Sequence, residues 1–297
     1  MTAKACIRSM RLRTLPLSLA GITLGVLLAA GGHALSWLTV ALLVLTTVCL
    51  QILSNLSNEL GDTLHGTDRS DRQGIHYSIQ DGEMTVPEMK KLIGCVAALC
   101  CVFGAGMVWS AFGTWFAPLP LAFLALGGAA VWAAMHYTLG KNPYGYRGLG
   151  DVFVFIFFGL ATVCGSYYLC CLEWDWLILL PAAAIGCFSV GVLNVNNIRD
   201  MKSDAATRTT VAIKLGLRRA RIYQTLLIAA GWVLMTVYAV LTADSWPNFL
   251  YVCTLGSFCV HLKGVWTRED RALDPMLPLL VVSTFFFALL AGISNLF

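Results

Sequence analysis

Charged residues are scarce in this chain: Asp, Glu, Lys and Arg make up 12% of its 297 residues, whereas hydrophobic residues make up 58%. Soluble domains carry about 25% charged and about 45–50% apolar residues. The mean hydropathy of +0.74 is correspondingly high. This composition excludes a soluble globular domain, a disordered chain and a fibrous protein, and it predicts an integral membrane protein.

The motifs of several common enzyme classes are missing as well. The sequence has no Gly-x-x-x-x-Gly-Lys-Ser/Thr loop, no serine nucleophile elbow and no His-Glu-x-x-His motif. Its 11 cysteines form no Cys-x-x-Cys pair and fall mainly in apolar segments, which favours membrane packing over disulfides or metal binding. Nothing therefore points to nucleotide hydrolysis, metalloproteolysis or acyl transfer through a serine.

Long apolar segments dominate the chain instead. A helix that crosses a bilayer needs ~20 mostly apolar residues. Nine such segments are predicted, at approximately 15–34, 36–57, 92–112, 116–136, 149–171, 176–197, 221–242, 247–264 and 276–296. The predicted fold is an all-α, multi-pass bundle of nine transmembrane helices that forms a single integral membrane domain over residues 1–297.

The basic residues predict how this bundle is oriented. If nine spans alternate, all 20 Lys and Arg residues fall on the side of the N-terminus, and the other side carries only Glu173, Asp175 and Asp244 as charged residues. Loops rich in Lys and Arg stay in the cytoplasm. We therefore expect a cytoplasmic (inner) membrane protein with its N-terminus in the cytoplasm and its C-terminus outside.

Two clusters of oxygen-bearing side chains follow the second and the sixth predicted spans. The first runs from Asn58 to Asp68, and the second from Asn196 to Asp204. Asn58 and Asp62 share one face if the second span continues as a helix, and Asn196, Asp200 and Asp204 form a similar stripe. The repeated Asn-x-x-x-Asp spacing predicts two related four-helix halves that face each other, with a ninth helix added.

Two groups of carboxylates approach each other in a cavity at a membrane border only when cations lie between them. Oxygen ligands beside Lys and Arg suit Mg²⁺ that is bound through the phosphates of a substrate, because Mg²⁺ prefers few protein carboxylates. The alternative is that these are solvated acids of cytoplasmic loops. The matching spacing of the two clusters favours the metal interpretation, with catalytic loops at approximately 58–91, 137–148 and 198–220.

A third segment on the same predicted side, Tyr137 to Asp151, is rich in Gly and Tyr and carries Lys141 and Arg147. Alone, it is typical of an aromatic belt at the membrane interface followed by a basic loop. Beside two clusters of metal-binding type, it is a natural wall for an anionic or aromatic substrate.

At these residues the sequence resembles the UbiA-type intramembrane aromatic prenyltransferases, and among them the 1,4-dihydroxy-2-naphthoate polyprenyltransferases of menaquinone biosynthesis. The similarity covers nearly the whole chain. It rests on an Arg-x-x-Thr-Leu-Pro start at Arg11, on the two aspartate-rich motifs, on Tyr137-x-x-x-Lys141 and on the branch-specific run from Pro143 to Asp151. Glu59 and Tyr77 depart from the family pattern, which usually has Asp and Arg there.

The resemblance implies a cavity that faces the cytoplasm and opens laterally to lipid. It also implies transfer of a polyprenyl group from its diphosphate to the naphthoate ring, with Mg²⁺ as cofactor, loss of CO₂ and pyrophosphate, and demethylmenaquinol as product. The expected partners are a polyprenyl diphosphate, an aromatic acceptor and the lipid bilayer, with no nucleic acid. Chain length and oligomeric state stay open.

The residue roles follow from the same resemblance. Two Mg²⁺ ions are expected to bind oxygen-bearing side chains of the two motifs, namely Asn58, Asp62, Asp68, Asn196, Asp200 and Asp204. The diphosphate is expected to contact basic residues, namely Lys141, Arg72, Arg199, Arg11 and Arg13. Tyr137 and Tyr146 are expected to face the substrate. Asp151 either orients or deprotonates a hydroxyl of the acceptor, or only caps the fifth span.

Two alternatives remain open. The first keeps the chemistry and changes the acceptor, to 4-hydroxybenzoate, a chlorophyll-type ring or haem, since no physical argument fixes the ring. The second is a cation-coupled transporter. Transporters usually place ionisable groups near the middle of the bilayer, whereas these acids lie at the ends of the predicted spans. The sequence therefore favours the enzyme.

Overall fold

The structure, a computed structural model, describes residues 2–66, 78–242 and 246–296. The predicted Asp68 and Arg72, and the variant position Tyr77, lie outside these ranges. Within them, nine helical stretches are long and apolar enough to cross a membrane: Ala3–Ala30, Trp37–Leu64, Val86–Phe112, Pro118–His136, Gly150–Cys171, Trp176–Arg199, Leu217–Thr242, Asn248–Thr267 and Asp270–Ser294. These stretches confirm the predicted all-α fold with nine spans.

The helices of these stretches are α1 (Ala3–Met10), η1 (Leu12–Thr14), α2 (Leu15–Ala30), α3 (Trp37–Leu64), α4 (Val86–Phe112), α5 (Pro118–His136), α6 (Gly150–Val154), η3 (Phe155–Ala161), α7 (Thr162–Cys171), η4 (Trp176–Ile178), α8 (Leu179–Arg199), α11 (Leu217–Thr242), η5 (Trp246–Thr254), α12 (Leu255–Thr267), η6 (Asp270–Leu273) and α13 (Met276–Ser294). Three short helices, η2 (Tyr144–Arg147), α9 (Met201–Asp204) and α10 (Val211–Leu215), lie in connecting segments.

Local sequence signals explain where several of these helices begin. Thr85 and Glu88 form a capping box, in which the Glu88 carboxylate accepts from Thr85 N at 2.9 Å and Thr85 Oγ1 accepts from Glu88 N at 3.4 Å. Pro118 stands at the first position of α5, where the N–H that it lacks has no helical partner. Ser36 caps α3 through Thr39 N.

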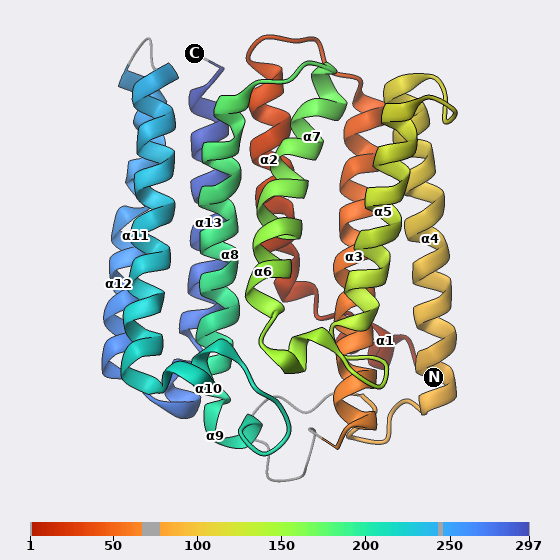
Figure 1. The fold of residues 1–297 in the computed structure, drawn as a ribbon, viewed down its shortest axis with the longest axis vertical. Helices are drawn as coiled ribbons and strands as arrows, with labels where there is room; N and C mark the ends of the chain where they lie inside the picture. Colours follow the sequence, from red (N-terminus) through yellow and green to blue (C-terminus); the bar gives the residue numbers. More distant parts are fainter. Residues whose placement is uncertain (1, 67–77, 243–245, 297) are drawn as a thin grey trace.

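The helices gather into two packed groups (Figure 1). One group is α3, α4 and α5, and it encloses a core around Leu53, Leu56 and Met89. The other contains α8, α11, α12 and α13, with α2 and α7 beside them, and its core lies around Phe188 and Phe287. That the bundle consists of two related four-helix halves stays a prediction, because packing into two groups does not show that the groups repeat one structure.

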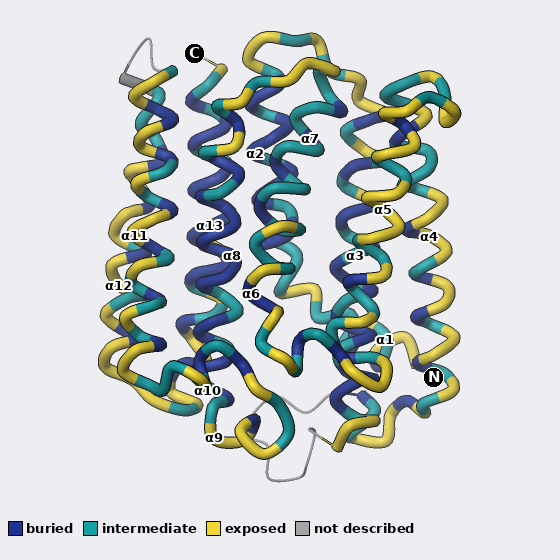
Figure 2. Tube along the Cα trace, viewed as in Figure 1, coloured by how far each residue is buried: buried dark blue, intermediate teal, exposed yellow. Residues whose placement is uncertain are grey.

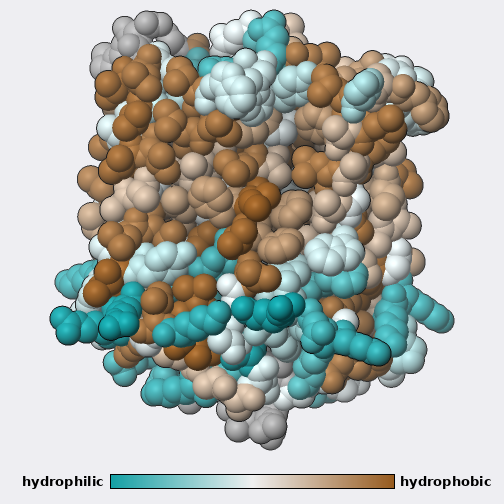
Figure 3. Space-filling view, in the orientation of Figure 1, coloured by the Kyte–Doolittle hydropathy of each residue, from teal (hydrophilic) through white to brown (hydrophobic). Residues whose placement is uncertain are grey.

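The two chain termini lie at opposite ends of the bundle, as an odd number of spans requires (Figure 1). Along α8 and α13 the chain is largely buried, whereas α4, α5, α11 and α12 expose much of their outward faces (Figure 2). The visible surface is hydrophobic over most of its height, and hydrophilic residues form a belt near the end that carries α9 and α10 (Figure 3). This pattern suits a protein whose sides face lipid and whose one end faces water.

The predicted boundaries need correction at the polar ends of two helices. α3 continues to Leu64, so Asn58 lies inside the helix and not in a loop spanning 58–91, and α4 already begins at Val86. α8 stops at Arg199, and Asp200 then caps it before α9 resumes at Met201. The i to i+4 bond pattern nevertheless continues, because Asp200 N bonds Asn196 O at 3.1 Å and Asp204 N bonds Asp200 O at 2.9 Å.

The fifth span contains a distorted segment. Between α6 and α7 the chain winds as the π-helix η3, a geometry that is rare and often found at functional sites. Gly159 lies in it against α8, where a Cβ atom would stand 2.5 Å from Gly186 Cα. Close packing at this glycine holds η3 on α8 and fixes the wall that it presents to the inside of the bundle.

Candidate active site

A polar cavity of about 360 Å³ lies inside the bundle near the end that carries α9 and α10. Its walls come mainly from η1, α2, α3, α8 and α13, together with Arg11 and the segments that follow α5 and α9. They include seven of the predicted site residues and one further arginine, namely Arg11, Arg13, Asn58, Asp62, Tyr137, Asn196, Arg199 and Arg208. The fold therefore brings Asn58 and Asp62 of the first motif, Asn196 of the second and part of the basic set to one cavity, whereas Asp200 and Asp204 line neither cavity.

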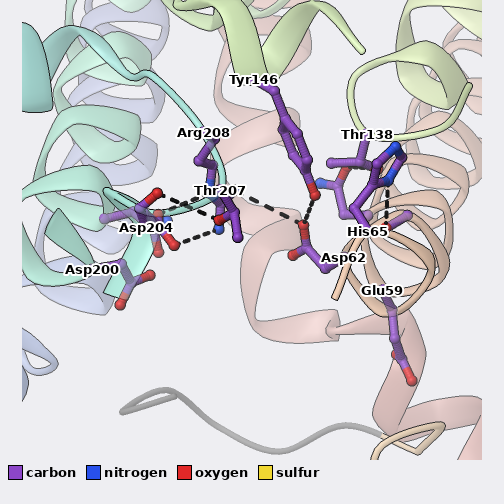
Figure 4. Close-up of polar contacts among 12 residues, drawn as sticks. Glu59, Asp62, His65, Thr138, Tyr146, Asp200, Asp204, Thr207 and Arg208 are labelled. Carbon is purple, nitrogen blue, oxygen red and sulfur yellow. Dashed lines mark hydrogen bonds and ion pairs between the residues drawn. The ribbon is translucent and has the colours of Figure 1, made fainter. Parts of the chain in front are cut away.

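Arg208 links the two motifs (Figure 4). Its Nη2 donates to Asp204 Oδ1 and its Nε lies by Asp204 Oδ2, both at 2.9 Å, while its Nη1 lies 3.9 Å from Asp62 Oδ1. The phenol of Tyr146 donates to the same Asp62 oxygen at 2.8 Å, and its ring centroid lies 5.4 Å from the guanidinium carbon of Arg208. A protein cation thus already lies between the two acidic motifs.

The charge of Arg208 is secured by this arrangement. Burial disfavours a charged guanidinium, but the negative charges of Asp62 and Asp204 outweigh that effect and raise the pKa of Arg208. The arginine side chain is only 8% exposed, and those of Asp62 and Asp204 are 6% and 1% exposed. Removal of Arg208 would take from both buried carboxylates the cation that they share.

A second arginine binds the other acid of the second motif. Arg199 donates from Nε and Nη2 to the two oxygens of Asp200, at 2.7 and 2.6 Å, and from Nη2 to Asn196 Oδ1 at 2.8 Å. Its Nη1 reaches Asp274 on the segment before α13 at 3.1 Å. Since Asn196 and Arg199 line the polar cavity and Asp200 is buried behind them, Arg199 presents a positive charge to the cavity.

The segment after α5 approaches α3 closely. A Cβ atom on Gly61 would stand 2.5 Å from Thr138, so a larger residue at position 61 would push this segment away. Thr138 Oγ1 donates to Ser57 O at 2.9 Å and lies 3.2 Å from Asn58 Oδ1. These contacts place Tyr137 beside the cavity. Burial raises the pKa of Tyr137 to about 12 against the opposing charge of Arg208, so its phenol is neutral.

A second, mostly apolar cavity of about 310 Å³ extends from the polar cavity into the bundle. Gln51, Asn58, Tyr137 and Phe158 line both. The other walls come mainly from α3 and α5 on one side and from α6, η3 and α7 on the other. The site therefore combines a charged compartment at the end of the bundle with an apolar compartment between the helices.

Three comparisons with known proteins agree with this geometry. The model of the UbiA prenyltransferase family matches residues 18–294. The chain belongs to the UbiA prenyltransferase family. Over 295 residues, this UbiA prenyltransferase is 38% identical to the 1,4-dihydroxy-2-naphthoate octaprenyltransferase of Haemophilus influenzae, which covers 95% of this chain and 94% of that one. It is 36% identical to the enzyme of the same name from Escherichia coli, over 92% and 89% of the two chains.

Solved structures of archaeal homologues share the fold. The apo structure of a UbiA homolog from Aeropyrum pernix K1 superposes with a TM-score of 0.73 at 16% identity, covering 95% of this chain and 98% of that one. A UbiA homolog from Archaeoglobus fulgidus bound to DMAPP and Mg²⁺ superposes with a TM-score of 0.66 at 16% identity, covering 96% and 99%. At such low identity, these superpositions establish the fold of this UbiA prenyltransferase only.

Some predicted site residues lie away from the two cavities. Lys141 is exposed in the segment after α5 and lines neither of them. Asp151 is buried in the first turn of α6, where its Oδ2 accepts from the Tyr223 phenol of α11 at 3.0 Å, and it lines neither cavity. This contact joins α6 to α11, and both predicted roles of Asp151 stay predictions.

Three residues of this UbiA prenyltransferase were not predicted as part of the site. Arg208 was counted only among the basic residues of its side, and Gln51 and Asn55 lie within an apolar span. A signal for the last two exists in the sequence, because Gln51, Asn55, Asn58 and Asp62 are spaced by four, three and four residues. That spacing places four polar side chains on one face of a membrane helix. Arg208 likewise continues the stripe of the second motif, because it stands four residues after Asp204.

The donor set fits Mg²⁺ in one particular way. Among residues 2–66, 78–242 and 246–296, no three acidic, histidine or cysteine side chains gather closely enough to hold a metal ion by themselves. The carboxylates and amides present are hard oxygen ligands, which suit Mg²⁺ when water and phosphate oxygens complete its coordination. The site of this family member therefore suits a metal that arrives on a diphosphate.

Proposed function

We propose that this prenyltransferase transfers a polyprenyl group from polyprenyl diphosphate to 1,4-dihydroxy-2-naphthoate, with loss of CO₂ and pyrophosphate, to give demethylmenaquinol. The observation that carries the proposal is the polar cavity between two Asn-x-x-x-Asp motifs, joined to an apolar cavity through shared wall residues. The relatives from Haemophilus influenzae and Escherichia coli that carry the corresponding name support the naphthoate as acceptor.

The diphosphate is proposed to bind in the polar cavity. Arg11, Arg13, Arg199 and Arg208 surround it with positive charge, and preorganised charge of this kind stabilises a departing pyrophosphate. Lys141 and Arg72 are proposed as further diphosphate contacts from the adjoining segments. The proposed Mg²⁺ ligands are the oxygen-bearing residues Asn58, Asp62, Asp68, Asn196, Asp200 and Asp204. When bound, Mg²⁺ supplies Lewis acidity that neutralises the charge developing on pyrophosphate.

The prenyl chain is proposed to lie in the apolar cavity, with its reactive end beside Tyr137. Departure of pyrophosphate leaves an allylic cation, which aromatic faces stabilise. Tyr137 lines both cavities and is neutral, so it presents a ring without a competing charge. Tyr144 packs edge-on against it, with ring centroids 5.4 Å apart, and lines the apolar cavity too.

The acceptor ring then attacks that cation. The bond between the allylic carbon and the diphosphate oxygen breaks, and a new carbon–carbon bond forms at the ring carbon that carries the carboxylate. Loss of CO₂ returns the bonding electrons to the ring, so the step needs no separate base. This balance agrees with Asp151 being occupied by Tyr223, and we propose that Asp151 acts by holding α6 against α11.

The proposed setting is the cytoplasmic (inner) membrane, with residues 1–297 as one membrane domain. We propose that the polar cavity and the N-terminus face the cytoplasm and that the C-terminus lies outside. The location of all 20 Lys and Arg residues on one side of the predicted topology supports this orientation.

The test uses the full chain in lipid nanodiscs with farnesyl diphosphate, Mg²⁺ and either 1,4-dihydroxy-2-naphthoate or 4-hydroxybenzoate, with products identified by mass. A decarboxylated prenyl-naphthoquinol is expected from the first acceptor. The rate at which this product forms should fall at least about a hundredfold in Asp200→Ala. It should not fall in the control Asp270→Asn, which removes a surface ion pair with Lys202. Product from hydroxybenzoate alone would overturn the acceptor assignment.

A further inference from the structure

A buried polar network lies where the two cavities meet, away from the acidic motifs. Gln51 and Asn55 of α3, Thr14 of η1 and Ser18 of α2 form it. Gln51 and Asn55 are 9% and 4% exposed, and Ser18 is 4% exposed. Gln51 lines both cavities, whereas Asn55 and Ser18 line the apolar one. A polar group in a mostly apolar wall is costly unless it has partners, so its hydrogen-bonding capacity can be counted.

Every N–H group of the two amides already has an acceptor. The Asn55 amide donates to Met10 O and to Thr14 Oγ1, both at 2.9 Å. The Gln51 amide donates to Thr14 Oγ1 at 3.1 Å and to Asn55 Oδ1 at 3.2 Å. The carbonyl of Met10 fixes which Asn55 atom is nitrogen, and Thr14, which donates to Arg11 O at 3.0 Å, fixes the orientation of Gln51 in turn.

The unused capacity of the network consists only of acceptor lone pairs. Gln51 Oε1 accepts from the Ser18 hydroxyl, and Asn55 Oδ1 accepts from Gln51. Each carbonyl oxygen has a second lone pair. Since all amide donors are satisfied, this wall is able to receive hydrogen bonds and has no N–H left to give. It therefore suits a ligand that carries O–H groups and disfavours a carboxylate or a phosphate.

The position of these acceptors matches the place of the ring in the proposed reaction. Gln51, Asn55, Asn58 and Asp62 lie on one face of α3. Asn55 stands seven residues before Asp62, about 10 Å along the helix, and Gln51 about 16 Å. A diphosphate beside Asp62 would leave the allylic carbon near the level of Asn58, with the amide oxygens just beyond it. The carboxylate of the acceptor would then turn towards the polar cavity.

We propose that Gln51, with Asn55, accepts a hydrogen bond from a ring hydroxyl of the aromatic acceptor, and so selects a hydroxylated ring and orients it for attack. The proposal rests on the proposed function. An amide is too weak a base to take the proton, so the hydroxyl keeps it, and the hydrogen bond leaves more electron density on the ring. The simpler alternative, a tether of η1 to α3, accounts for the donors of the network but not for its spare acceptors.

The test compares 1,4-dihydroxy-2-naphthoate with its two mono-methyl ethers, in nanodiscs, for the wild type, Gln51→Met and Gln51→Glu. The wild type is expected to lose about tenfold in kcat/KM with at least one ether, because its methyl group replaces the donated proton. In Gln51→Met, kcat/KM for the parent compound and for the ethers should differ by less than about twofold, because the methionine side chain offers no comparable acceptor. Gln51→Glu keeps an acceptor oxygen and should keep the preference.

For each variant, the measured quantity is the ratio of kcat/KM for the parent compound to kcat/KM for an ether. Intrinsic differences in ring reactivity enter this ratio equally in every variant, so they cancel when variants are compared. Gln224→Met is the matched control, because Gln224 is a buried amide in a separate network with Asn194 and His261 and lines neither cavity. The KM for farnesyl diphosphate should change less than about twofold in Gln51→Met if the amide contacts only the ring.

The outcomes separate the two proposals. A wild type that does not prenylate dihydroxynaphthoate overturns the proposed function and this inference with it. An active wild type that treats both ethers like the parent compound overturns the inference alone, even if Gln51→Met fails to fold. The inference is also overturned if Gln51→Met keeps the full preference for the hydroxyl, or if Gln224→Met loses it.

Discussion

Arg208 Nη1 lies 3.9 Å from Asp62 Oδ1, although the two residues belong to distant parts of the chain. Arg208 lies on the loop between α9 and α10, and Asp62 lies on α3. The same guanidinium holds Asp204 at 2.9 Å. The two acidic motifs thus carry their own counterion, and much of the behaviour of the site follows from that pairing.

Replacing Arg208 by Met should destabilise the fold, because the buried carboxylates of Asp62 and Asp204 would lose the cation that contacts them both. We expect a loss of about 3–5 kcal/mol in unfolding free energy, typical of removing one partner of a buried ion pair. Denaturant unfolding in detergent micelles measures it. Arg208→Lys should recover part of the loss, since it restores the charge without the two-pronged contact with Asp204. Equal stability of Arg208→Met and the wild type would contradict this role for the arginine.

The carboxylate of Asp62 should matter for turnover more than for folding. Asp62→Asn keeps the shape and an acceptor for the Tyr146 phenol, but it removes a negative charge from the cavity. We expect kcat to fall by about 10²–10³-fold, on the scale of other preorganised electrostatic groups. Product formation at saturating substrates gives the value, and Asp81→Asn, which removes an exposed partner of Arg8, is the control. A drop below tenfold would argue against a metal role for Asp62.

Free Mg²⁺ should bind the substrate-free protein weakly, because no three acidic groups of the described ranges converge and because Arg208 and Arg199 already occupy the carboxylates. With a non-hydrolysable prenyl diphosphate analogue present, we expect the affinity for Mg²⁺ to rise by at least about tenfold, since phosphate oxygens complete its coordination. Titration calorimetry with and without the analogue measures the change. EDTA should abolish product formation, and added Mg²⁺ should restore it.

Tyr137 should make the fold sensitive to alkali. Its pKa is raised to about 12 from the ordinary value of 10 by burial. The folded state therefore favours the neutral phenol, a contribution that is fully present below pH 10 and is lost as the pH rises towards 12. Between pH 9 and 11.5, the wild type should lose more thermal stability than Tyr137→Phe. If thermal stability falls with pH equally in the two proteins, the pKa of Tyr137 is not raised by folding, and the prediction is wrong.

The sequence was sufficient for the helices and for the two motifs, because apolar length and the spacing of polar residues along a helix are local properties. Asn58 and Asp62 share a helical face as predicted, since α3 continues past the apolar part of the span. The spacing of Arg208 from Asp204 was a local signal, but its contact with Asp62 could not be predicted, because that contact depends on how a loop folds back across the bundle. Gln51 and Asn55 were overlooked because their neighbours are apolar, although their spacing continues the stripe of the first motif. The exposure of Lys141 likewise depends on the path of the segment after α5.

The wall of the apolar cavity bears on the length of the prenyl chain, which the site residues leave open. α5 packs against α3 and α4, and the cavity separates it from η3 and α7. Leu126 of α5 lines that cavity and is 38% exposed, and we propose that the cavity opens to the lipid there. A cavity with an open side does not limit the length of the chain that it holds. The far end of a long isoprenoid would rest among the lipid tails, and we expect the length of the attached chain to follow the supply of diphosphates in the membrane.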